Sequence, residues 1–79
     1  MSKASAYFTV GNIDGKHDVK ELKRELDTLH GVLSVSVNER TERIAVDFDT
    51  TGTEQERIQK RIEKLGYHVS EVQFENHVM

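Results

Sequence analysis

Apolar residues change their spacing along this chain in an order that few folds can accommodate. Residues 7–13 alternate, with Phe8 and Val10 on one face, which is typical of a half-buried strand. After this strand the spacing becomes that of a helix, with an apolar stripe made by Val19, Leu22, Leu26 and Leu29. Gly31 then predicts the end of the helix.

The second half of the chain repeats this change of period. Residues 33–37 and 44–48 alternate on either side of a polar segment, which predicts a β-hairpin with Leu33 among its buried residues. A second amphipathic helix follows, and its apolar residues are Ile58, Ile62 and Leu65. Gly66 predicts its end.

The last strand is expected from Tyr67 to about Phe74. Val69 is out of phase with Val72 and Phe74, so we expect a β-bulge near Ser70. Residues 76–79 are expected to form a frayed tail.

Two short patterns predict where the helices begin. Asp18 with Glu21, and Thr53 with Glu56, each place an acidic residue three positions after a capping residue. We therefore expect Asp18 and Thr53 to be the N-caps of the two helices.

The order of elements is βαββαβ, which is the ferredoxin-like motif. The predicted class is α+β, with a four-stranded antiparallel sheet and both helices on one face, because the two crossovers are right-handed. The chain is expected to be one domain over residues 1–79, with its core at about 6–74.

Composition argues for a binding module and against several other classes. A chain of 79 residues buries only about 60 to 65% of its unfolded surface, which leaves little room for a deep catalytic cleft. The net charge of −3, with acidic and basic residues spread along the chain, argues against a nucleic-acid partner. RNA binding would also require aromatic residues on the open sheet face, which instead offers Ser34, Ser36, Ala45 and Asp47.

The sequence contains no cysteine, which excludes disulfides and thiolate metal sites. Residues 1–6 lack the apolar core of a signal peptide, and no apolar run approaches the length of a membrane span. We therefore expect a cytoplasmic protein that does not insert into membranes.

The connection from the first strand to the first helix carries the candidate site. Gly15 permits a tight turn there, and the helix N-terminus that follows can hold an anion or a metal ligand. The polar side chains in this connection belong to Asp14, Lys16, His17 and Asp18.

Several fragments of the chain, taken together, resemble the heavy-metal-associated domain, a copper-chaperone-like module that also occurs on metal-pumping ATPases. They are Phe8-x-Val10, Leu29-x-Gly31-Val32, and the stretches 34–38, 44–49 and 62–69. In that family the first loop reads Gly-Met-x-Cys-x-x-Cys, and the two thiolates hold Cu(I). Aligned without gaps, the family's Gly and Met fall on Asn12 and Ile13, and its two cysteines fall on Gly15 and Asp18.

This replacement disfavours Cu(I), because soft thiolates select that ion whereas carboxylate and imidazole suit borderline ions. Asp14, His17 and Asp18 can together supply three ligands to Zn(II) or Ni(II). Each also has a simpler role, since Asp18 can cap the helix, Asp14 can bond the turn backbone, and His17, like Lys16, can be solvated.

Two further residues are placed near this loop by the resemblance. Tyr67 is expected beside it, where the side chain either shields the site or caps the edge of the core. His68 follows and faces either the loop or solvent. No bound cofactor is expected other than a weakly held divalent metal.

Three functions follow from these observations. The first is an interaction module that has lost its Cu(I) ligands and binds another protein through the sheet face or the 12–18 loop. The second is a metal-binding or transport protein that uses Asp14, His17 and Asp18. The third is an acylphosphatase-like enzyme in which Lys16 and Asn38 hold a phosphate. Both sheet edges can pair with another chain, so a homodimer is a further option.

Overall fold

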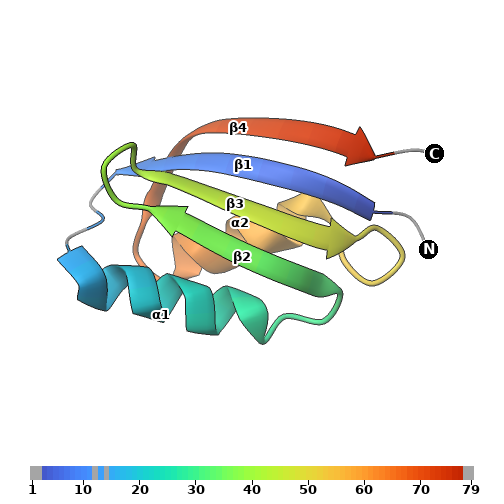
Figure 1. The fold of residues 1–79 in the computed structure, drawn as a ribbon, viewed down its shortest axis with the longest axis horizontal. Coiled ribbons are helices and arrows are strands. Elements are labelled where there is room, and N and C mark those ends of the chain that lie inside the picture. Colours follow the sequence, from blue (N-terminus) through green and yellow to red (C-terminus); the bar gives the residue numbers. More distant parts are fainter. Residues whose placement is uncertain (1–2, 12, 14, 78–79) are drawn as a thin grey trace.

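The computed structural model describes residues 3–11, 13 and 15–77. Its elements are β1 (Lys3–Gly11), α1 (Gly15–Asp27), β2 (Val32–Asn38), β3 (Arg43–Asp49), α2 (Gln55–Lys64) and β4 (His68–His77). The strands form one antiparallel sheet in the order β2-β3-β1-β4. Both helices pack on the same face of this sheet (Figure 1). The predicted ferredoxin-like fold is confirmed.

The core lies between the sheet and the two helices. Alternate residues of the central strands point into it: Ala4, Ala6, Phe8 and Val10 from β1, and Ile44, Val46 and Phe48 from β3. The helices contribute Leu22 and Leu26 from α1, and Ile58 and Ile62 from α2. Each of the larger side chains stabilises the fold by about 1.5 to 3 kcal/mol when it leaves water.

The bulge predicted in the last strand is present. Thr9 pairs with Glu71 but its neighbour Val10 pairs with Val69, so Ser70 is the extra residue of β4. The Ser70 hydroxyl donates a hydrogen bond of 3.1 Å to the Thr9 carbonyl. The bulge changes the phase of β4, so that Val69 points to the same face of the sheet as Val72.

A second bulge, in β2, contradicts the prediction for Leu33. Val32 pairs with Phe48 and Ser34 pairs with Asp47, which leaves Leu33 as the extra residue. The side chain of Leu33 is 44% exposed instead of buried. The prediction failed because alternation within β2 does not reveal a change of register against β3.

The ends of the first and last strands differ from the prediction. β1 begins at Lys3 rather than Tyr7 and ends at Gly11 rather than at residue 13. Its first residues pair with the end of β4, where Lys3 is opposite His77. Residues 76 and 77 are therefore part of a strand, not of a frayed tail; residues 78 and 79 lie outside the described residues.

Both predicted N-caps are wrong. α1 begins at Gly15, so Asp18 lies within its first turn. α2 has Glu54 as its N-cap, without a side-chain cap hydrogen bond. Thr53 is instead buried in the preceding turn, where its backbone N–H donates to the Asp49 carbonyl at 3.1 Å. Thr53 therefore belongs to the turn after β3, although the local pattern placed it at the start of the helix.

This turn lies directly against the connection between α1 and β2. A Cβ atom added to Gly31 would lie 2.7 Å from the backbone carbonyl carbon of Gly52. Gly31 also has φ +89°, and its carbonyl accepts a hydrogen bond of 2.7 Å from the Asp49 N–H. A side chain at position 31 is therefore excluded by both space and backbone conformation.

Candidate functional site

Three connections meet at one end of the domain. They are the β1–α1 loop, the β2–β3 turn and the α2–β4 connection, and all lie at the left of Figure 1. A hydrogen bond of 2.8 Å from the Val10 N–H to the Glu42 carbonyl ties the end of β1 to the β2–β3 turn. Gly15 starts α1 with φ +77°, a conformation that glycine adopts at low cost. The end of the domain that the sequence indicated as the site is thus assembled from segments that are distant along the chain.

Tyr67 and Asp18 meet at this end. Tyr67 is only 8% exposed. Burial raises the pKa of Tyr67 to about 12, with further contributions from the charge of Asp18, a hydrogen bond with Asp18, and the charge of Glu21. The phenol is therefore neutral at physiological pH and donates to the Asp18 carboxylate. Asp18 is already engaged by a protein group.

Of the predicted metal set, the described residues His17 and Asp18 do not come together. The His17 side chain is 89% exposed, and its Nε2 lies 3.9 Å from Oε2 of Glu21, one turn further along α1. Asp14 lies outside the described residues. Among the described residues, no three His, Asp or Glu side chains are placed to share a metal ion. The ligand set of Asp14, His17 and Asp18 stays a prediction.

The predicted neighbours of the loop have different environments. Ile13 is partly buried and packs against the core, as expected for the apolar position of the loop. Lys16 and His68 are exposed. Tyr67 is buried with the core and interacts with Asp18 of α1, which fits the role of capping the core edge. Its role in shielding the loop stays a prediction. The Asp18–Tyr67 bond itself was not predicted, although the resemblance placed the two residues near each other.

The geometry gives no support to the phosphate site of an acylphosphatase-like enzyme. The Asn38 side-chain oxygen accepts hydrogen bonds from the backbone N–H groups of Arg40, at 3.0 Å, and Thr41, at 3.4 Å. These bonds stabilise the β2–β3 turn in the manner usual for asparagine. Asn38 therefore has a structural role in its own turn.

The open face of the sheet carries polar contacts between strands. Asp47, on β3, accepts hydrogen bonds from the hydroxyls of Ser5 and of Ser34. Arg43 lies over the ring of Tyr7, 5.1 Å from its centroid, and donates from Nη2 to Oε1 of Gln73 at 2.7 Å. This face is therefore a polar surface with one aromatic ring.

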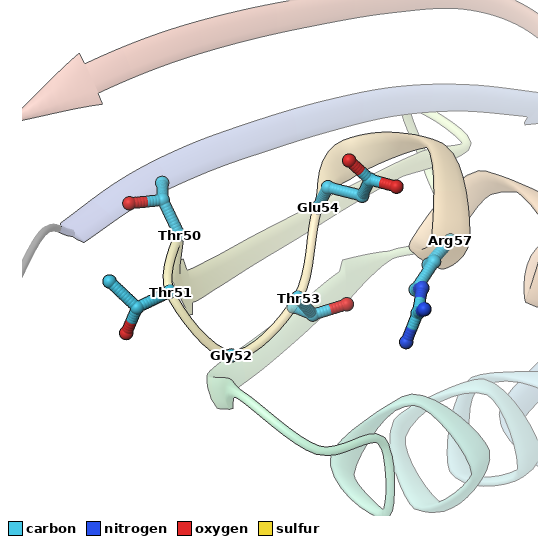
Figure 2. A pocket seen from close by; sticks show the side chains of 6 residues that line it. All are labelled: Thr50, Thr51, Gly52, Thr53, Glu54 and Arg57. Atoms are coloured by element: carbon cyan, nitrogen blue, oxygen red, sulfur yellow. The ribbon is translucent and has the colours of Figure 1, made fainter.

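A polar hollow lies at the opposite end of the domain, around the β3–α2 connection. Figure 2 shows the residues that line it, and the side chain of Thr53 points toward that of Arg57. Asp49 organises the connection by accepting hydrogen bonds from the Thr51 hydroxyl at 2.7 Å and the Thr51 N–H at 3.0 Å. These bonds lower the pKa of Asp49. Since Glu54 balances Arg57 in its lining, this hollow shows no preference for an ion of either sign.

None of the helices in the described part of the chain is long and apolar enough to cross a membrane.

Comparison with known proteins identifies the family. The model of the heavy-metal-associated domain matches residues 7–68. No curated protein sequence matches the chain. The chain belongs to the heavy-metal-associated domain family, as the resemblance predicted. Domains of this family are generally non-catalytic metal-binding modules.

Solved structures, two of which are described as copper proteins, share the fold. The copper form of a single-substitution variant of CopA from Bacillus subtilis is 31% identical, with a TM-score of 0.70, over 85% of this chain and 88% of that one. A putative copper-ion-binding protein from Bacillus anthracis is 24% identical, with a TM-score of 0.81, over 86% and 96%. Oxidized MerP from Ralstonia metallidurans is 21% identical, with a TM-score of 0.78, over 87% and 99%.

Proposed function

We propose that this chain is a non-catalytic heavy-metal-associated domain that binds another protein and does not carry Cu(I). The observation that carries the proposal is the state of the two cysteine positions of the family. Gly15 offers no side-chain ligand, and Asp18 is bonded to Tyr67. A carboxylate is also a poor ligand for a soft ion. The scaffold is present without the groups that would hold the cargo.

Geometry within α1 also disfavours a divalent site built on His17 and Asp18. Adjacent residues of a helix point about 100° apart, so they do not face a common ion. His17 lies near Glu21, whereas Asp18 is turned toward Tyr67. An ion held by both would require the Asp18–Tyr67 bond to open.

Two surfaces are candidates for a protein partner. The first is the 12–18 loop, where Lys16 and His17 are exposed. The second is the open sheet face, where the exposed Arg43 lies over the half-buried ring of Tyr7 in a cation–π pair. Such pairs are common in protein interfaces because Arg and Tyr combine apolar area with hydrogen-bonding groups.

The claim that the chain carries no metal ion is tested on protein purified without chelator. Native mass spectrometry should show a chain without a bound ion, and titration with Zn(II), Ni(II) or Cu(I) should leave the backbone NMR signals of residues 15–18 and 67 unmoved. A chain that leaves the cell with one firmly held Cu(I) would overturn the proposal.

The claim that the chain binds another protein is tested by cross-linking in the native host, followed by mass spectrometry of the linked peptides. The proposal expects a reproducible link from lysines of this domain to one other protein, and reconstitution of that complex from purified components. A monomer that forms no complex in cells or after reconstitution would contradict it.

A further inference from the structure

A shallow groove runs between α1 and the free edge of the sheet. One wall belongs to α1 and contains three basic residues, Lys20, Lys23 and Arg24. The acidic residue in the lining is Asp27, also on α1. The floor is formed by Leu33 and Val35 of β2, together with Ser34. This groove is distinct from the 12–18 loop and lies beside the open sheet face, with which it shares only Ser34.

The floor of the groove is an edge strand. In the described sheet β2 pairs with β3 on one side and has no strand on the other (Figure 1). An edge of this kind presents backbone N–H and C=O groups that can pair with an added strand. An extended segment laid beside β2 would therefore find backbone groups with which it can form hydrogen bonds.

The bulge in β2 gives this edge an apolar contact. Leu33 is the extra residue of β2, and 44% of its side chain is exposed. Val35, two residues along, is half-buried and also faces the groove. An added strand would cover both side chains and remove apolar surface from water.

The helix wall determines the charge of the partner. Lys20 and Lys23 are exposed and form no ion pair with the described residues. Arg24 has only a contact of 3.9 Å from its Nε to Oε2 of Glu25, and exposed pairs of this length contribute little. The groove is therefore positive, although the chain as a whole carries a net charge of −3.

We propose that this groove docks an extended acidic segment of another protein, which adds to the sheet as a strand beside β2. The inference rests on the proposed function as an interaction module and names the chemistry of its partner. Backbone pairing with β2 provides the geometry, Leu33 provides the apolar contact, and the three basic residues of α1 select acidic side chains.

A second basic hollow provides a matched control. It is lined by residues of α2, including Lys60 and Lys64, with Leu29 beside them. It is lined by four basic residues and no acidic one, and it has one apolar residue but no strand edge in its lining. Attraction that depends on charge alone would use this hollow at least as much as the groove beside β2.

The probe is a short blocked peptide in which Glu alternates with Val, titrated into the full chain and followed by backbone NMR. Signals of α1 and β2 should move. Lys20→Glu combined with Lys23→Glu should weaken binding roughly tenfold or more, whereas Lys60→Glu combined with Lys64→Glu should change it little. A peptide with N-methylated backbone should lose binding to a similar extent, because it cannot pair with the strand edge.

Other results would overturn the inference. These are equal losses in the two double variants, unchanged binding of the N-methylated peptide, and movement of signals confined to another surface. Self-association that is abolished by Lys20→Glu with Lys23→Glu would also overturn it, because the occupant would then be a second copy. A cross-linked complex on the sheet face of a metal-free chain would refute the inference but leave the proposed function standing, whereas firmly bound Cu(I) would refute the proposed function.

Discussion

Asp18, in the first turn of α1, and Tyr67, just before β4, are joined by a hydrogen bond. Asp18 stands at one of the two positions that the resemblance aligns with the cysteines of the family. The bond connects α1 to the α2–β4 connection through protein groups alone. In a metal-binding relative, two thiolates at these positions would hold an ion. Here a carboxylate and a phenol hold the corresponding segments together.

Removing the Tyr67 hydroxyl should destabilise the fold. Tyr67→Phe should lower the free energy of unfolding by about 2 kcal/mol, because a buried hydrogen bond to a charged group is lost. Urea unfolding at neutral pH measures this. Tyr7→Phe is the control, since it keeps the ring over which Arg43 lies and should cost much less. Equal losses in the two variants would contradict the assigned role of Tyr67.

The environment of Tyr67 also predicts a loss of stability in alkali, because burial, together with the charge of Asp18 and the hydrogen bond with it, raises the pKa of the phenol. The pKa of Tyr67 is raised from 10.0 in the unfolded chain to about 12 in the fold, so between these values the unfolded chain releases a proton that the folded chain keeps. Stability must therefore fall as pH rises through this interval, by roughly 2 kcal/mol. The difference in unfolding free energy between the native chain and Tyr67→Phe should shrink from pH 10 to 12. A constant difference would show that Tyr67 does not titrate in this way.

Restoring the two cysteines should restore the metal site. Gly15→Cys combined with Asp18→Cys should bind one Cu(I), because soft thiolates at the spacing of the family select that ion. Competition with a Cu(I) chelator, followed by absorbance, measures the affinity. The variant should be less stable, by about 1 kcal/mol at position 15 because Gly15 has positive φ, and by about 2 kcal/mol at position 18 because Asp18 bonds Tyr67.

Two thiols at other positions of the same turn provide the control for this gain. Lys16→Cys combined with His17→Cys places adjacent thiols on different sides of α1 and should bind Cu(I) much more weakly. If both double variants bound the ion equally, the gain would not reflect a preserved family geometry.

The contact between Gly31 and Gly52 should be sensitive to a single methyl group. Gly31→Ala should cost about 3 kcal/mol, because it combines positive φ with a Cβ placed 2.7 Å from the Gly52 backbone. Gly66→Ala should cost only about 1 kcal/mol, since Gly66 has φ +102° but no atom within 4 Å of the added Cβ. Thermal or urea unfolding of the two variants isolates the cost of the close approach, and similar losses would contradict it.

The two bulges differ in how visible they were from the sequence. The bulge at Ser70 could be predicted because Val69 and Val72 have opposite parity although both are apolar. The bulge at Leu33 could not, because Leu33, Val35 and Val37 have the same parity and fit an uninterrupted strand. Only the register against β3 shows that Val32, not Leu33, faces Phe48.

The predictions of where the two helices begin were wrong for a different reason. The patterns at Asp18 and Thr53 are local, and in the tertiary structure each residue has a partner outside the predicted cap. Asp18 is used by Tyr67, while the Thr53 N–H is used by the Asp49 carbonyl. A capping pattern reports what a residue can do, not which of its possible partners lies within reach.

The sequence by itself determined the order of the elements, through two changes of apolar period, and the loss of the thiolate site, through the identities of Gly15 and Asp18. Those properties depend on spacing and residue type, both of which are readable along the chain. Only the tertiary structure decided that Asp18 meets Tyr67, and that α1 and the edge of β2 enclose a basic groove. Both involve segments distant along the chain, and their meeting depends on how the helices pack on the sheet.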